Sequence, residues 1–138
     1  MDRINQLTHS VVDDIDNCSD LKSIENLRIK YFGKNVMILN PQHLKIFGNN
    51  ISIGDYATLI TAPDKRIDLS TWETDKINGE LQLGKYILIS PGTSIRSAQK
   101  IVIGDSTMIA SDVTITDSDW HDIYDRTDYV ATPKEVFI

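Results

Sequence analysis

The segment from Ile115 to Arg126 concentrates the side chains of this chain that are best suited to chemistry. It contains one histidine, His121, which follows Asp117 and Asp119. An imidazole titrates near neutral pH and can accept a proton from a weakly nucleophilic hydroxyl group. A carboxylate on the other ring nitrogen would fix the tautomer and stabilise the imidazolium. Both aspartates are candidates for that partner, and a solvated histidine in a polar loop is the plainer alternative.

Three further side chains of this segment could contact a ligand. Trp120 offers an aromatic ring, which suits the apolar face of a pyranose, or it fixes the loop simply by being buried. Tyr124 and Arg126 could contact a bound molecule or a neighbouring subunit, although packing within the loop is the more ordinary role. The aspartates of the segment lack the regular ligand spacing of a cation site, so no metal ion is expected there.

The elements that must position this segment follow from a repeat of six residues. An aliphatic residue precedes a glycine in Ile53-Gly54, Leu83-Gly84 and Ile103-Gly104, and further aliphatic residues follow at intervals of six. This period excludes an α-helix, because a helix repeats its apolar positions at about 3.6 residues. It predicts short strands joined by tight turns and stacked as the coils of a β-solenoid. Within each three-residue strand, the outer two side chains should point inward and the middle one outward.

Some parts of the chain depart from the repeat. Residues 1–34 space their apolar side chains as helices do, which predicts two short amphipathic helices that cap the solenoid. Within residues 35–138, the intervals between repeats predict loops at 64–80 and 117–135, although Arg66–Leu69 is expected to continue the second coil, and such loops often carry function. Val136–Ile138 matches the triplets that precede a glycine, so the sequence is expected to stop as a new coil starts. Either a partner covers that coil or the chain is a shortened form of a longer solenoid.

Composition narrows the classes of function. The chain has 138 residues and a formal net charge of −6, which argues against binding to nucleic acid phosphates. Cys18 is the sole cysteine, so neither a disulfide framework nor a thiolate metal site is expected. The sequence shows no signal peptide and no run of apolar residues long enough to span a bilayer. These features predict a single cytoplasmic domain.

The repeat and the segment from Ile115 to Arg126 together resemble the bacterial hexapeptide-repeat acyltransferases, particularly those that O-acetylate sugars of surface polysaccharides. The resemblance spans residues 34–138, and the Asp-x-Asp-Trp-His string is its most specific part. It implies a mainly β fold, a left-handed parallel β-helix, and assembly into homotrimers. It also implies acetyl-CoA as the acyl donor, bound between neighbouring subunits. The acceptor would be a hydroxyl group of a sugar, presented as a sugar nucleotide or a lipid-linked glycan.

By this resemblance, His121 matches the general base of the family, and Asp117 or Asp119 would orient its imidazole. The galactoside-type acetyltransferases of this family commonly have an asparagine in the turn one coil before the histidine, where it helps to hold the acceptor. This chain has Ser90-Pro91-Gly92 in that turn. Ser90 could contribute a hydroxyl group there, but the identity of the acceptor does not carry over.

Two other functions are compatible with the predicted solenoid. The main alternative is a trimeric module without catalytic activity, serving assembly or binding. The γ-type carbonic anhydrases share the solenoid but need three histidines on one metal ion. Here His9 falls in the predicted helical cap and His43 in the first coil, so His121 is alone near the loop and a metal site is not expected.

Overall fold

A computed structural model describes residues 32–119 and 133–138, which form a β-solenoid. Equivalent strands of successive coils pair in parallel, giving three four-stranded sheets. The first sheet contains β1 (Met37–Leu39), β4 (Thr58–Ile60), β7 (Leu88–Ile89) and β10 (Met108–Ile109). The second contains β2 (Leu44–Phe47), β5 (Ile67–Thr71), β8 (Ser94–Ser97) and β11 (Thr114–Thr116). The third contains β3 (Ile51–Ile53), β6 (Glu80–Leu83), β9 (Lys100–Ile103) and β12 (Val136–Phe137), and a 3-10 helix, η1 (Pro41–His43), precedes β2.

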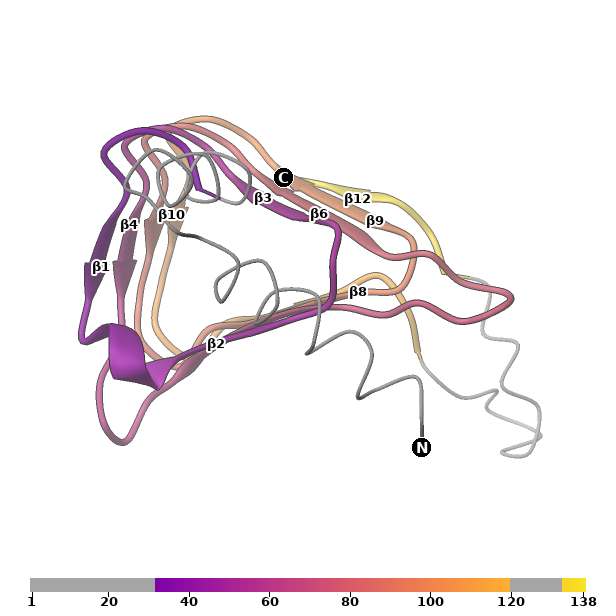
Figure 1. The fold of residues 1–138 in the computed structure, drawn as a ribbon, viewed down its shortest axis with the longest axis horizontal. Coiled ribbons are helices and arrows are strands. Elements are labelled where there is room, and N and C mark those ends of the chain that lie inside the picture. Colours follow the sequence, from indigo (N-terminus) through magenta and orange to yellow (C-terminus); the bar gives the residue numbers. More distant parts are fainter. Residues whose placement is uncertain (1–31, 120–132) are drawn as a thin grey trace, which may run out of the picture.

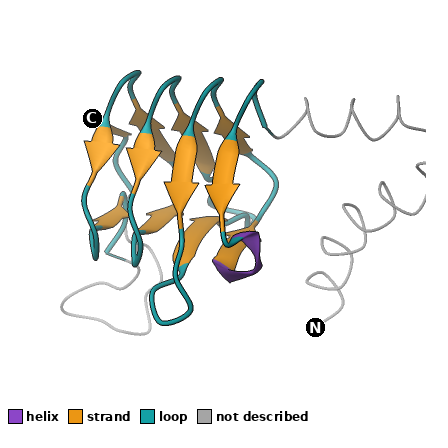
Figure 2. Ribbon diagram, turned by 90° about the vertical axis from the view of Figure 1, so that its left-hand side faces the viewer, coloured by secondary structure: helices purple, strands orange, loops and turns teal. Residues whose placement is uncertain are grey.

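The coils wind as a left-handed β-helix with a triangular cross-section. In Figure 1 the chain runs down β1, along β2 and back along β3, so it turns counterclockwise as the coils recede from the viewer. Figure 2 shows the four strands of the first sheet side by side and pointing the same way. The predicted mainly β, left-handed parallel β-helix is therefore confirmed.

Aliphatic side chains of successive coils stack into columns inside the triangle. The aligned pairs Leu59 and Ile89, Leu69 and Ile95, and Leu81 and Ile101 all have no exposed surface. Burying a side chain of this size stabilises a protein by about 1.5–3 kcal/mol relative to leaving it exposed. These columns form one continuous core and hold the strands in a fixed register.

The predicted alternation of side chains is confirmed in the third sheet and wrong for the triplet in β8 of the second. In β3, Ile51 and Ile53 are buried and Ser52 between them is exposed. In β8 the buried residues are Ile95 and Ser97, so the middle residue of the triplet Ser94–Arg96 points inward. The phase differs because the aliphatic residue of this hexad stands between two polar residues rather than beside the corner.

The repeated glycine stands where the backbones of two coils approach each other closely. This first corner joins the third sheet to the first, and there the N–H of Gly84 donates a hydrogen bond of 2.8 Å to the carbonyl of Ile103. A Cβ atom on Gly84 would lie 2.7 Å from the backbone nitrogen of Asp105 in the next coil. The left-handed residue of this corner comes two positions later, at Tyr86 with a φ of 57°. The glycine is therefore required for close approach and not for an unusual dihedral angle.

The strand expected at Arg66–Leu69 is present beside the loop predicted within 64–80. Residues Ile67–Thr71 form β5, in which Ile67 and Leu69 are fully buried. A tight turn precedes this strand, closed by two hydrogen bonds of 3.1 Å between Ala62 and Lys65, and a hairpin at residues 72–79 follows it. The hairpin thus falls within the range of the predicted loop.

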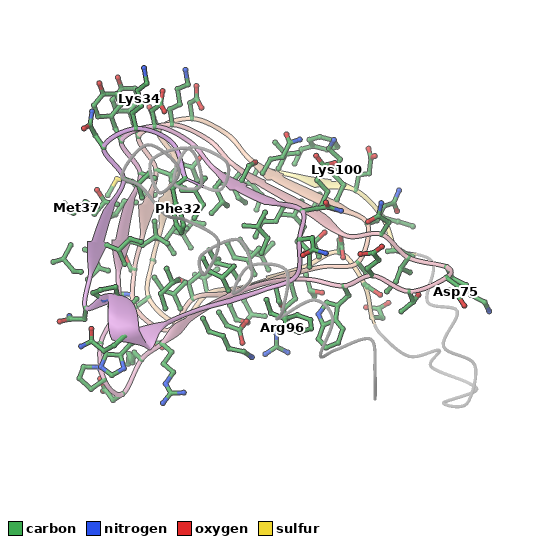
Figure 3. All side chains as sticks on the ribbon, viewed as in Figure 1. Phe32, Lys34, Met37, Asp75, Arg96 and Lys100 are labelled. Carbon is green, nitrogen blue, oxygen red and sulfur yellow. The ribbon has the colours of Figure 1, made fainter. Side chains whose placement is uncertain are left out.

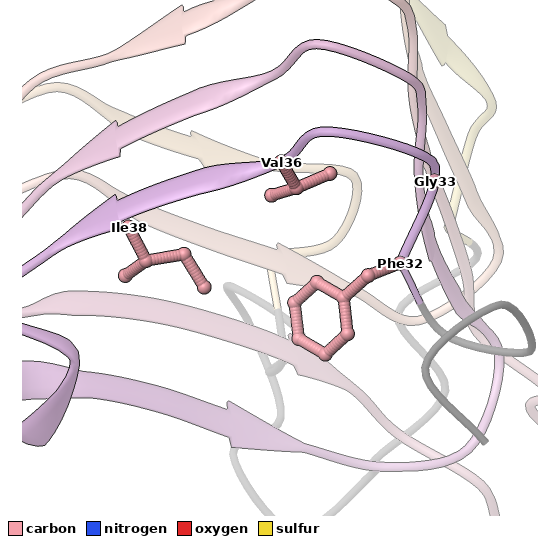
Figure 4. Close-up of a pocket in the computed structure, with 4 residues that line it drawn as sticks. All are labelled: Phe32, Gly33, Val36 and Ile38. Atoms are coloured by element: carbon pink, nitrogen blue, oxygen red, sulfur yellow. The ribbon is translucent and has the colours of Figure 1, made fainter. Parts of the chain in front are cut away.

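The solenoid starts before the predicted boundary at residue 34. Phe32 forms a parallel bridge with Ile53, and Phe32, Gly33, Val36 and Ile38 line a pocket of about 180 Å³ at this end of the core (Figure 4). The helical cap predicted for residues 1–34 otherwise falls on residues 1–31, outside the described residues. Within the described part of the chain, no helix is long and apolar enough to cross a bilayer.

At the other end, Val136–Ile138 takes the place predicted from its match to the earlier triplets. Val136 aligns with Ile101 in the third sheet. The N–H of Gly104 donates a hydrogen bond of 2.7 Å to the carbonyl of Ile138, as Gly84 does to Ile103 one coil earlier.

Replacing Gly84 with alanine should separate the coils at the first corner. We expect Gly84→Ala to lower the free energy of unfolding by about 1–3 kcal/mol, because the new methyl group meets backbone that cannot yield locally. Urea unfolding followed by circular dichroism measures this. The matched control is Lys85→Ala at the exposed neighbouring position. Equal stability of the two variants would contradict the packing argument.

Candidate functional site

Asp117 follows β11 at the third corner, which joins the second sheet to the third, and its carboxylate is buried. One oxygen, Oδ1, accepts a hydrogen bond of 2.7 Å from the N–H of Ala98. The other, Oδ2, accepts from the Ser97 hydroxyl at 2.7 Å and from the N–H groups of Gln99 and Lys100 at 2.8 Å each. Asp117 therefore closes the tight turn of the preceding coil.

This geometry separates the two aspartates that the sequence left equal. Asp117 is committed to four donors of the turn, and hydrogen bonds to a charged acceptor are about twice as strong as those between neutral groups. Turning this carboxylate toward another group would leave those donors unpaired in a buried place. Asp119, two residues further on, is exposed. Of the two, Asp119 has the freedom to approach a neighbouring side chain.

Both ends of the predicted loop at 117–135 meet at this same corner. The N–H of Lys134 donates a hydrogen bond of 3.0 Å to the carbonyl of Asp117. Ser118 is buried, and its carbonyl accepts a hydrogen bond of 3.1 Å from the Thr116 hydroxyl. The described ends of this loop, residues 117–119 and 133–134, thus lie together at the third corner.

The hairpin at residues 72–79 leaves from the third corner as well, two coils earlier. The N–H of Trp72 donates a hydrogen bond of 3.0 Å to the carbonyl of Ser97, which fixes the hairpin to the tight turn closed by Asp117. Trp72 packs against Phe47 with ring centroids 5.2 Å apart and remains 42% exposed. In Figure 3, Asp75 at the hairpin and Lys100 after the turn mark this corner. The hairpin at residues 72–79 and the segment that begins at Asp117 both start at this corner, on either side of the turn at residues 97–100. The third corner is therefore the candidate site.

One ion pair lies beside the turn. The Lys100 ammonium is 3.0 Å from Glu80 Oε2, and the Gln82 amide donates a hydrogen bond to the other oxygen. The hydrogen bond from Lys100, reinforced by that from Gln82, lowers the pKa of Glu80 below its ordinary value. This pair was not predicted from the sequence, although the twenty-residue coil spacing between Leu83 and Ile103 also separates Glu80 from Lys100.

Ser90 lies at a different place in the chain. It follows β7 at the second corner, between the first and second sheets, and is half-buried. Its carbonyl accepts a hydrogen bond of 2.8 Å from the Thr93 hydroxyl. Lys65 of the preceding coil reaches Asp112 of the following coil at 2.5 Å, and this contact raises the pKa of the Lys65 ammonium. Ser90 and Asp119 of one chain thus lie at opposite ends of the strands of the second sheet.

The remaining predicted site residues, Trp120, His121, Tyr124 and Arg126, lie outside the described residues. Their assigned roles stay predictions. Among residues 32–119 and 133–138, no cluster of three or more potential metal ligands occurs. Of the predicted site, the structure thus describes Asp117, Asp119 and Ser90.

Comparisons with protein-family models, with curated proteins and with solved structures yield no match. The fold is known from the stacked strands themselves. The chemistry must be argued from the third corner and the segment that leaves it.

Replacing Asp117 with asparagine tests its role at the turn. An amide offers one acceptor oxygen and sets an NH₂ group against backbone donors. We expect Asp117→Asn to lower the free energy of unfolding by about 1.5–3 kcal/mol, whereas Asp119→Asn, at an exposed position, should change it by less than about 0.5 kcal/mol. Chemical unfolding of the two variants measures both values, and equal effects would argue against the assigned role.

The pair of Glu80 and Lys100 should make a small, pH-dependent contribution to stability. The pKa of Glu80 is lower in the folded protein than its ordinary value of 4.5, so its stabilising effect is complete above that value and disappears as the pH falls through the folded pKa. Glu80→Gln should therefore cost no more than about 1 kcal/mol at neutral pH, because the pair is partly exposed, and nothing in acid well below 4.5. Urea unfolding at both pH values measures the difference, and a loss that persists in acid would contradict the assignment.

Proposed function

We propose that this chain is an acetyl-CoA-dependent O-acetyltransferase that acts on a hydroxyl group of a sugar. The observation that carries the proposal is the Asp-Ser-Asp-Trp-His string, which begins at a carboxylate fixed in the third corner of a left-handed β-helix. Rigid solenoids with loops at their corners suit such chemistry, because the frame fixes where the loop begins and ends.

In this proposal His121 is the general base. It would take the proton of the sugar hydroxyl as that oxygen attacks the thioester carbonyl of the donor. The imidazolium would then return the proton to the departing thiolate, so that the acetyl ester and a free thiol are the products. Asp119 is the favoured carboxylate for orienting the imidazole, because Asp117 is committed to the turn at residues 97–100.

Acetyl-CoA carries phosphate groups, and cationic side chains would be needed to bind them. Near the third corner the described cations are Arg96 on β8, Lys76 in the hairpin, Lys134, and Lys100, which is already paired with Glu80. No described contact gathers these side chains into a phosphate site. The homotrimer implied by the resemblance would bring residues of a second chain into the site. Ser90 lies at the second corner, away from the third corner of its own chain. It would therefore contribute to a site between two chains rather than to a site within one chain.

The proposal predicts thiol release from acetyl-CoA that depends on a sugar acceptor and on His121. A panel of monosaccharides, sugar nucleotides and lipid-linked glycans should contain at least one acceptor for the unmodified chain. We expect His121→Ala to lower kcat/KM by about 10²–10⁴-fold, which is the usual contribution of a general base. Asp119→Asn should lower kcat more than it raises KM, since it would disturb the base rather than binding.

The matched control is His43→Ala, because His43 lies in η1 at the second corner, away from the proposed base. Its kcat/KM should equal that of the unmodified chain. If a correctly folded chain transfers no acetyl group to any acceptor, or if His121→Ala is as active as the control, the enzyme is excluded. An assembly or binding module would then be the better account.

A further inference from the structure

Two tyrosine side chains stand outside the solenoid at the first corner and stack on each other. Tyr56 and Tyr86 each follow the repeated glycine by two residues. Their ring centroids are 5.0 Å apart and their planes lie 1° from parallel, yet they are 47% and 60% exposed. The stack covers one face of each ring. The other faces can still pack against an apolar surface of a ligand.

The backbone conformation at this position does not favour tyrosine. Each coil has a residue with a positive φ between 55° and 59° here, in the order Asn35, Tyr56, Tyr86 and Ser106. This left-handed conformation is ordinary for glycine and asparagine and uncommon for bulky side chains. The turn alone therefore does not explain the two tyrosines. A bulky residue held in such a conformation at an exposed place points to a role for its side chain.

The stack ends at Tyr86, because the next coil has Ser106 at the same position. The corner repeats from coil to coil: the N–H of Tyr86 donates to the carbonyl of Asp55 at 3.0 Å, and that of Ser106 donates to the carbonyl of Lys85 at 2.8 Å. Neighbouring coils are about 4.8 Å apart, so a ring stacked on the free face of Tyr86 would lie at the level of Ser106. A serine side chain is too short to cover that face. We call it the open face of Tyr86.

Asp105, next to Ser106, adds a hydrogen-bond acceptor to this place. Its Oδ1 accepts a hydrogen bond of 2.7 Å from the N–H of Lys85, as Asp55 Oδ1 does from the N–H of Lys34. The Oδ2 of Asp55 also lies 3.9 Å from the Lys85 ammonium. Among residues 32–119 and 133–138, neither the Oδ2 of Asp105 nor the Ser106 hydroxyl has a partner. Two polar groups available to a ligand therefore lie beside the open face of Tyr86.

The charges at the first corner favour an uncharged ligand. Lys34, which marks this corner in Figure 3, and Lys85 formally balance Asp55 and Asp105. An anionic ligand would approach a chain with a net charge of −6 and meet the carboxylate of Asp105. A cationic ligand would be attracted to that carboxylate and to the ring, but it would share the corner with two ammonium groups. A neutral ligand meets neither repulsion.

We propose that the first corner binds a neutral sugar, with a pyranose ring stacked on the open face of Tyr86. One side of a pyranose presents C–H groups, which pack on an aromatic face. Its hydroxyl groups can donate to the Oδ2 of Asp105 and exchange hydrogen bonds with the Ser106 hydroxyl. The proposed acetyl transfer also involves a sugar, but at the third corner. The binding site at the first corner does not depend on it, and its test measures binding rather than turnover.

The experiment titrates the full chain with the methyl pyranosides of glucose, galactose, mannose and N-acetylglucosamine, and saturation-transfer NMR gives the dissociation constants. Ser106→Tyr places a third ring on the open face of Tyr86, at a position whose φ of 59° matches the 57° of Tyr86. We expect it to raise the dissociation constant at least tenfold and to leave the protein folded. The matched control is Ser52→Tyr, which adds a tyrosine at an exposed position of β3 and should bind as the unmodified chain does.

A second pair of variants tests the carboxylate. In Asp105→Asn the amide oxygen can still accept from the N–H of Lys85, but the NH₂ group cannot accept a hydrogen bond from a sugar. We expect this variant to raise the dissociation constant at least fivefold. Asp55→Asn makes the same change where the ring stack is closed, and it should alter the constant less than twofold. His121→Ala should bind sugar as the unmodified chain does.

Several results would overturn the proposal. They are a folded chain that binds none of the four pyranosides, equal binding by Ser106→Tyr and Ser52→Tyr, and equal effects of the two asparagine variants. Tighter binding of adenosine or tetramethylammonium, lost in Ser106→Tyr, would assign the open face to a planar or a cationic ligand instead. Circular dichroism confirms that each variant is folded. A chain that binds sugar at the first corner but transfers no acetyl group would contradict the proposed function alone.

Discussion

The close stacking of backbone on backbone at the first corner is the constraint on which the rest of this molecule depends. Parallel strands of successive coils lie about 4.8 Å apart, and at the corner this distance leaves no room for a side chain. A Cβ atom on Gly54 would lie 2.6 Å from the backbone of Gly84 in the next coil. Because each corner is held at this distance, the aliphatic residues of successive coils align in register and form unbroken columns. The repeat of glycine and the repeat of aliphatic residues are thus two consequences of one geometry.

The same stacking creates the need that Asp117 meets. A tight turn exposes several backbone N–H groups on one side, and such a concave set of donors favours an anion. The turn at residues 97–100 receives the carboxylate of Asp117 from the following coil, so one side chain links two coils and fixes the start of the excursion. The segment after Asp117 therefore begins at a fixed position on the solenoid. A catalytic group on such a segment would need only local ordering to reach a defined position.

How much the sequence could reveal depended on whether a feature repeats. The period of six predicted the strands and the equivalence of Val136–Ile138 with the earlier triplets, because each coil imposes the same requirement. It also predicted the strand at Arg66–Leu69, where Ile67 and Leu69 are buried in β5. It did not predict contacts that one residue alone makes with a neighbouring coil. The role of Asp117 was hidden because its hydrogen-bond partners lie 17 to 20 residues earlier in the chain.

Charged side chains are distributed unevenly over the outer faces of the three sheets. The second and third sheets carry ion pairs between coils on their outer faces, and charged surfaces of this kind remain hydrated at little cost. The first sheet has neither charge nor a described cover, and burying it would cost no ionic hydration. The third corner lies between the two charged sheets, and the hairpin at residues 72–79 and the segment after Asp117 both begin there. Polar chemistry can take place at this corner in contact with solvent.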